Sequence, residues 1–190
     1  MLKAMCAVRV VALLAVGSIA VSGCLPIHSA EEPYRTGVAR VGDSYLVFPP
    51  LCAGEAVVAV HVYDNAAAGA ANIDPYADPR FTWWRVESLR PSVQPSRTIT
   101  LGDDAPYQRV LVEANAGAPF PEIAAVGLTV TFPGGSKQLD DTFTVSDVPT
   151  YDAGTDPATV KYSFHHDGER TDLTMDEISK KSKCARDYPY

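Results

Sequence analysis

The sequence lacks the residue patterns that carry familiar catalytic chemistry. It has no Gly-x-Ser-x-Gly nucleophile elbow, no His-Glu-x-x-His zinc motif and no Walker phosphate loop. The stretch Gly134–Lys137 contains two glycines, a serine and a lysine, but not the four-residue spacer of a phosphate loop. A Ser/His/Asp triad is defined by geometry and stays open as an alternative. These absences predict a protein that is not an enzyme and that uses no cofactor.

Basic residues and long apolar runs are also scarce. The longest run of apolar or small residues, Val10 to Val21, falls short of the roughly 20 residues of a membrane-spanning helix. The first 23 positions hold two of the 16 basic residues and none of the 23 acidic ones, so the other 167 residues carry a formal net charge of −9. That length predicts one domain. That charge argues against nucleic acid as a partner and against adhesion to anionic lipid head groups.

Cysteine is limited to four positions, of which Cys24 is the most informative. It is preceded by Val-Ser-Gly, and before that by the apolar run and by the basic residues Lys3 and Arg9. This pattern resembles the lipobox of bacterial lipoproteins. The resemblance implies a signal peptide at residues 1–23, a diacylglyceryl group on the Cys24 thiol and a further acyl chain, such as palmitate, on its new amine. An ordinary secretory signal and an uncleaved anchor are the alternatives.

The lipoprotein resemblance also implies an address and an organisation. Residues 24–33 would be a lipidated tether, and residues 34–190 a single domain on the extracytoplasmic face of the cell membrane. The nine residues after Cys24 span at most about 30 Å, which keeps the domain close to the bilayer. The membrane is therefore one expected partner, reached through the lipid anchor.

Two cysteines remain outside the signal and the anchor, namely Cys52 and Cys184. Disulfides persist outside the cytoplasm, and neither cysteine has a Cys-x-x-Cys or Cys-His neighbour that would indicate a metal or catalytic thiol. We predict that they form a disulfide, which would attach the C-terminal segment to the start of the fold.

Alternation of apolar and polar residues dominates the chain after the tether. This two-residue period is typical of antiparallel sheets with one buried face. Glycine-rich turns separate the runs, as at Pro133–Ser136 and Asp167–Gly168. The pattern predicts a mainly β protein, an antiparallel β-sandwich, for which an immunoglobulin-like order is one arrangement. The expected strands lie at 45–48, 58–62, 82–89, 98–101, 109–113, 126–132, 142–145 and 160–165.

One short helix is predicted near the C-terminus. Thr174 and Glu177 have the spacing of a capping box, and Lys180, Lys181 and Lys183 follow where a helix dipole favours cations. By contrast, the alanine- and proline-containing segment from Ala66 to Arg80 is interpreted as the longest loop, and long loops often carry function.

This loop and the aromatic residues around it form the predicted contact site. Trp83 and Trp84 are consecutive on a strand, so one is expected in the core and the other exposed or covered by the 66–80 loop. With Tyr76, an exposed tryptophan could stack on a sugar or anchor a protein partner. The carboxylates of Asp74 and Asp78 add polar contacts to the same candidate site. We therefore expect a binding or structural module that presents loops to an envelope protein or a glycan.

The alternative function is a metal-binding envelope protein or enzyme. His165, His166 and Asp167 are the densest group of zinc-capable side chains, and the acidic loops supply oxygens for calcium. Neighbouring residues on a strand point to opposite faces, so the two histidines do not converge easily on one ion. Carboxylates at turns also commonly cap their own backbone, which is the simpler interpretation of the acidic pairs.

Overall fold

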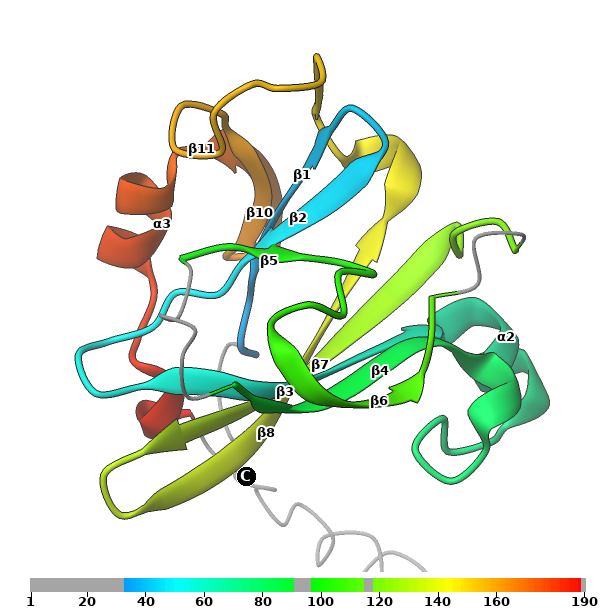
Figure 1. Ribbon diagram of the computed structural model, residues 1–190. Helices are drawn as coiled ribbons and strands as arrows, with labels where there is room; N and C mark the ends of the chain where they lie inside the picture. Colours follow the sequence, from blue (N-terminus) through cyan, green and yellow to red (C-terminus); the bar gives the residue numbers. More distant parts are fainter. Residues whose placement is uncertain (1–32, 91–96, 115–117, 189–190) are drawn as a thin grey trace, which may run out of the picture. The chain divides into compact units, whose positions relative to one another are not determined.

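A computed structural model describes residues 33–90, 97–114 and 118–188, and these residues form two β-sheets packed as a sandwich (Figure 1). The predicted mainly β, antiparallel sandwich is confirmed. The sheets hold six and five strands, in contrast to the four and three of a constant-type immunoglobulin domain.

The first sheet, sheet A, is built mostly from short strands. Its order is β11 (Glu169–Leu173), β10 (Tyr162–His166), β1 (Gly37–Val41), β2 (Ser44–Phe48) and β5 (Ile99–Thr100). A sixth strand, β9 (Thr150–Tyr151), pairs in parallel with β1, whereas the other pairs are antiparallel. The hairpin between β10 and β11 turns at Asp167 and Gly168. Both residues have positive φ, as the two central residues of a type I′ hairpin turn require.

The second sheet, sheet B, contains the longest strands. Its order is β6 (Tyr107–Val112), β4 (Thr82–Leu89), β3 (Ala56–Asp64), β7 (Ile123–Phe132) and β8 (Gly135–Thr144). All its neighbouring strands run antiparallel. Strands β3, β4 and β7 include the alternating runs that predicted them, and β7 turns into β8 through Pro133 and Gly134.

The core lies between the two sheets, and a second apolar cluster lies on the outer side of sheet A. In the main core, Val60 and Val62 of β3 face Val38 and Val47 of sheet A. The second cluster includes Phe48, Tyr162, Phe164, Met175 and Ile178. Both faces of sheet A are thus covered, so its outer face is not open to partners over this cluster.

The C-terminal helix α3 (Met175–Lys181) confirms the predicted capping box. The Thr174 hydroxyl accepts a hydrogen bond from the Glu177 amide at 3.4 Å, and the Glu177 carboxylate accepts one from the Thr174 amide at 2.8 Å. Met175 and Ile178 of this helix are buried against sheet A. These contacts satisfy backbone donors that a helix start leaves without partners. Figure 1 shows α3, in orange-red, beside β10 and β11.

The interpretation of residues 66–80 as a loop was wrong in its first half, where helix α2 (Asn65–Ala71) forms. Asp64 caps this helix by accepting a hydrogen bond from the Ala67 amide at 2.9 Å, and alanine has the highest helix propensity. Asn72 ends the helix in the left-handed region, with φ of 53°. A short 3₁₀ turn, η1 (Pro79–Phe81), precedes β4, and η2 (Val145–Asp147) follows β8.

The predicted Cys52–Cys184 disulfide is confirmed, with Cα atoms 5.3 Å apart and 132 residues between them in sequence. The carboxylate of Glu55 reinforces the same junction. It accepts hydrogen bonds from the amides of Cys52, Ala185 and Arg186, at 2.8, 3.1 and 3.0 Å. The disulfide and this carboxylate together hold the last 3₁₀ turn, η3 (Ala185–Asp187), against the start of β3.

Candidate binding site

Both tryptophans of the predicted contact site pack on the core. Trp84 is fully buried, and its indole Nε1 donates to the Asp104 carboxylate at 2.7 Å. Trp83 is half-buried and lies 4.8 Å from Phe120 in an edge-to-face contact. The pairing of β3 with β4 shifts register between Val62 and Tyr63, and this irregularity brings two consecutive side chains towards one face. Trp83 is thus not the exposed ring that one of the two expectations described; it packs against Phe120 and Gly102.

The 66–80 segment instead places Tyr76 on the outer face of sheet B. The Tyr76 ring lies 4.5 Å from the His61 ring and 5.9 Å from the Tyr63 ring, between centroids. Its hydroxyl donates to the Asp140 carboxylate at 2.5 Å and passes close over Gly127, whose missing side chain leaves the space. Tyr76 therefore fastens this segment to β3, β7 and β8.

His61 is the buried polar group under this aromatic contact. Its side chain is 4% exposed, Nε2 lies 2.8 Å from the Thr82 hydroxyl, and Nδ1 has no hydrogen-bond partner among the described residues. Burial and the nearby Arg85 guanidinium lower the pKa of His61 to about 4, against the opposing effect of Asp74. His61 is accordingly neutral at physiological pH.

A small hollow of about 60 Å³ lies beside His61 on this face. Its polar lining includes Arg85, Glu87 and Gln138. This space holds one or two waters and is too small for a sugar ring or a peptide. Burial also raises the pKa of Tyr76 well above its usual value and that of Tyr63 to about 12, so both remain neutral phenols. The cluster supplies packing and hydrogen bonds rather than a charged nucleophile.

The acidic side chains of the predicted site act as local caps. Asp74 accepts from the Tyr76 amide at 2.9 Å, and Asp78 accepts from the Arg80 amide at 3.0 Å and pairs with its guanidinium. That guanidinium and its backbone amide lower the pKa of Asp78. These contacts occupy both carboxylate oxygens of Asp78 and one of Asp74, atoms of the kind that calcium prefers as ligands.

The zinc-capable residues lie at the turn between β10 and β11. His165 and His166 end β10, and His166 lies 3.5 Å from the Asp167 carboxylate. Within the described ranges, no three His, Cys, Asp or Glu side chains come together as a group that could hold a metal ion. In the described part of the chain, the hairpin therefore lacks the third metal-ligating side chain that the metal-binding alternative requires.

A larger hollow, of about 190 Å³, lies between the edges of the two sheets. Leu89 and Tyr107 line it from sheet B, Ile99 and Thr100 from β5, and Leu51 from the segment after β2. Its lining is mixed, with aliphatic side chains beside the polar groups of Thr98, Thr100 and Asp103. The hollow is smaller than the roughly 300–1,000 Å³ of typical small-molecule pockets, but it can receive one aliphatic side chain.

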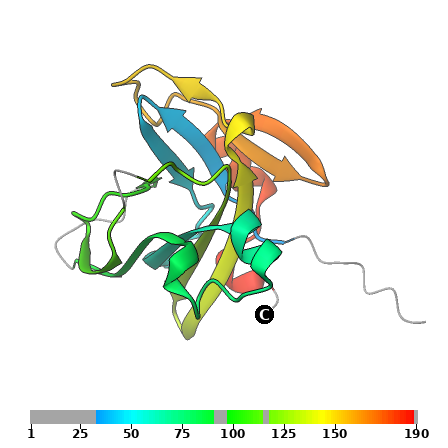
Figure 2. The ribbon, with the colours of Figure 1, turned by 90° about the vertical axis from the view of Figure 1, so that its right-hand side faces the viewer.

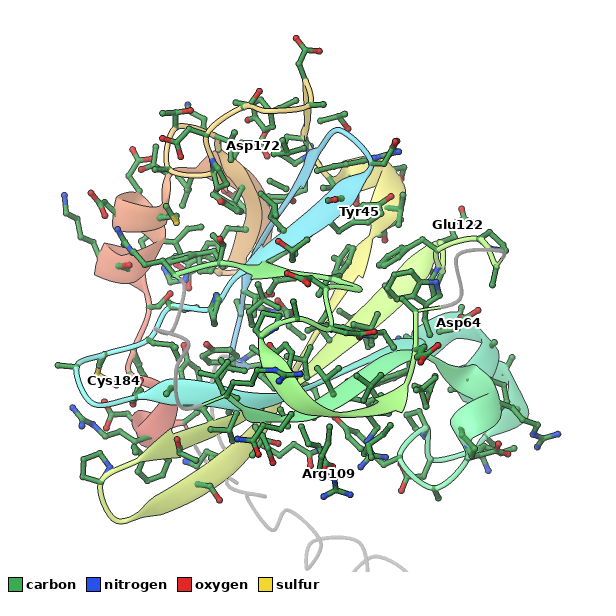
Figure 3. All side chains as sticks on the ribbon, in the orientation of Figure 1. Tyr45, Asp64, Arg109, Glu122, Asp172 and Cys184 are labelled. Atoms are coloured by element: carbon green, nitrogen blue, oxygen red, sulfur yellow. A yellow bond between two sulfur atoms is a disulfide. The ribbon has the colours of Figure 1, made fainter. Side chains whose placement is uncertain are left out.

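The strand next to this hollow, β6, forms an edge of sheet B. In the described part of the chain it pairs only with β4, and Val110 and Leu111 on it are 38% and 41% exposed. Arg109, also on β6, points away from the sandwich in Figure 3 and lies 3.3 Å from Glu87. Exposed apolar residues on an edge strand are the features through which an extended polypeptide adds to a sheet. Sequence reasoning missed this site because its lining comes from five separate segments; only the alternation at 109–113 pointed to the strand.

Comparison with family models, curated proteins and solved structures found no match for this chain.

In the described residues, no helix combines the length and the apolar composition needed to cross a membrane.

Proposed function

We propose that the protein is a lipid-anchored, exported envelope protein that works as a non-catalytic binding module. The observation that carries its binding role is the hollow that β5 and Tyr107 of β6 line, at one end of an edge strand that exposes Val110 and Leu111 further along. The partner we propose is an extended polypeptide segment of another envelope protein, which places one aliphatic side chain in the hollow.

The address of this module is proposed from its cysteines. Cys24 has the sequence context of a lipidated residue, but it lies outside the described residues. The Cys52–Cys184 bridge supports the same location, because disulfides form and persist in oxidising compartments such as the cell exterior. A thiol pair in a reducing cytoplasm would not be expected to stay oxidised.

A polypeptide partner is favoured over a glycan by the chemistry of the hollow. Proteins bind sugars through exposed aromatic platforms and several hydrogen-bonding side chains. Here Trp84 is buried, Trp83 packs on Phe120, and the hollow has aliphatic side chains such as Leu51, Val57 and Leu89 in its lining. Aliphatic side chains and unpaired strand edges match an extended peptide better.

Site-specific photocrosslinking in cells tests the proposal. A photoreactive residue replaces Leu111, and a matched control replaces Thr171, an exposed residue on the edge strand β11. We expect a discrete crosslinked protein from position 111 and none from position 171. The substitution Thr100→Trp, which fills the hollow, should remove the adduct while a thermal melt shows the variant is folded.

Two results would contradict the binding role. One is the absence of any adduct at position 111, and the other is an adduct that persists unchanged when the hollow is filled. Competition of the adduct by soluble cell-wall saccharides would instead assign the site to a glycan. Mass spectrometry of the N-terminal peptide tests the anchor separately, since acylated Cys24 is expected at the new N-terminus.

A further inference from the structure

Four exposed basic side chains follow one another closely in sequence at the C-terminal end of the domain. Lys180, Lys181, Lys183 and Arg186 form what we name the C-terminal basic patch. Residues 180–187 contain these four basic residues and one acidic residue, whereas residues 24–179 contain 10 basic and 22 acidic ones. The positive charge is therefore local, on a chain that is otherwise strongly acidic.

The helix dipole accounts for only part of this patch. Lys180 and Lys181 lie in the last turn of α3, where cations are favoured. Lys183 and Arg186 follow the helix, and the backbone there is held in place. Cys184 is disulfide-bonded to Cys52, and the Arg186 amide donates to Glu55. The patch is a fixed surface of the fold.

This surface lies next to the point where the described chain begins. The ring of Tyr34 is 5.2 Å from that of Tyr188, two residues after Arg186. Lys137 donates to the carbonyls of Arg186 and Tyr188, which ties the same segment to β8. Figure 2 shows the blue start of the described chain beside the red C-terminal elements.

A lipid anchor at Cys24 would bring this end of the domain to the bilayer. Eight residues separate Cys24 from Pro33, and they span less than about 30 Å even when fully extended. We propose that the C-terminal basic patch binds anionic phospholipid head groups and so sets the orientation of the domain on the membrane; this inference rests on the anchoring in the proposed function. The anchor alone would leave the domain free to rotate.

Simple electrostatics sets the size of the effect. Each basic residue near an anionic membrane surface raises the equilibrium constant for contact with that surface by about fivefold. The acidic remainder of the chain is repelled by the same surface, within a screening length of about 8 Å at physiological salt. A local positive patch on an acidic protein therefore orients it, even though its net charge opposes binding as a whole. An acyl chain and a basic patch are known to act together as two membrane signals.

Amine and guanidinium labelling on vesicles tests this inference with the acylated mature protein. The protein is reconstituted in phosphatidylcholine alone or with about one third phosphatidylglycerol, a content chosen to give the surface potential on which the effect depends. We expect acetylation of Lys180, Lys181 and Lys183 to fall at least about threefold on the anionic vesicles, given the fivefold preference for each residue. Arg186 should be protected from phenylglyoxal in the same way. High salt should restore both reactivities.

Matched variants complete the test. The triple substitution K180Q, K181Q and K183Q should abolish the protection of Arg186, whereas R80Q, R90Q and R109Q, which make the same charge change at other exposed positions, should leave it intact.

Equal labelling on the two vesicle types would overturn the inference, as would protection by a soluble anionic envelope polymer but not by phosphatidylglycerol. An unacylated Cys24 in the mass spectrum would refute the anchor instead, so the two failures are distinguishable.

Discussion

Removing the Cys52–Cys184 bridge should cost the domain a large part of its stability. The bridge closes a loop with a sequence separation of 132. In the chain-entropy treatment, releasing a loop of this length stabilises the unfolded state by about 5 kcal/mol. Domains of this size unfold with roughly 5–15 kcal/mol. The double variant Cys52→Ala/Cys184→Ala should therefore be close to the limit of folding.

The folded form of this variant should keep its structure, because Glu55 still holds the junction. Its carboxylate accepts three backbone hydrogen bonds from Cys52, Ala185 and Arg186, none of which needs the sulfur atoms. The loss should appear as a lower unfolding midpoint with little change in the native spectrum. At about 2–4 °C per kcal/mol for a chain of this length, we expect Tm to fall by about 10–20 °C.

Thermal and urea unfolding followed by circular dichroism measure this loss. Wild-type protein in a reducing agent serves as an independent comparison, because it should approach the variant. The variant Glu55→Ala, with the disulfide intact, should lose about 2–4 kcal/mol, since three backbone amides lose a charged acceptor. A double-cysteine variant that melts within about 2 °C of the oxidised wild type would refute the reasoning about loop entropy.

Three further predictions concern the aromatic residues of sheet B. The pKa of His61 in the folded protein, about 4, lies below its unfolded value of 6.5, so the contribution of neutral His61 to folding stability is full above pH 6.5 and is lost as pH falls towards 4. Urea titrations across this range should show that the free energy of unfolding of the wild type falls by about 2 kcal/mol more than that of His61→Gln. The variant Trp84→Phe should cost about 1–3 kcal/mol because the partly buried Asp104 carboxylate loses its donor, whereas Trp83→Phe should be nearly neutral because its Nε1 has no partner in the described part of the chain; equal losses would contradict this. The variant Gly127→Ala should displace the Tyr76 hydroxyl and raise the pKa of His61 towards 6.5, and an unchanged histidine titration by NMR would count against the contact.

Alternation and turn chemistry were sufficient to predict most of the sandwich. Residues 82–89 form β4 with the predicted bounds, and the Asp167–Gly168 turn joins β10 to β11 as expected. Period-two patterns are local, and a half-buried strand has to follow them whatever its neighbours are. Strands β1, β9 and β11 were not predicted, because β9 has two residues and β11 is polar throughout most of its length.

Helix α2 shows how a local signal was underweighted. Asp64, an alanine-rich run and Asn72 together form a helix start, body and end, but glycine at position 69 and two nearby prolines favoured a loop. The capping hydrogen bond from the Ala67 amide to Asp64 decides the outcome. This signal was readable in the sequence.

The two tryptophans illustrate what could not be read locally. Regular alternation requires Trp83 and Trp84 to point to opposite faces, and the shift in register against β3 removes that requirement. Such a shift is a property of two strands that are 20 or so residues apart in the chain. The position of Tyr76 on His61 and Asp140 depends in the same way on segments distant in sequence.

The sequence by itself determined the class of fold, the C-terminal helix and the pairing of Cys52 with Cys184, because each depends on local periodicity, local capping or the count of cysteines left to pair. Only the tertiary structure decided which surfaces are open. It buried Trp84 and packed Trp83 on Phe120, brought β5 and the start of β6 together around a hollow, and set Tyr188 beside Tyr34 at the beginning of the domain. Those outcomes depend on strand order and register, which arise from packing between distant segments and cannot be predicted from any single stretch of residues.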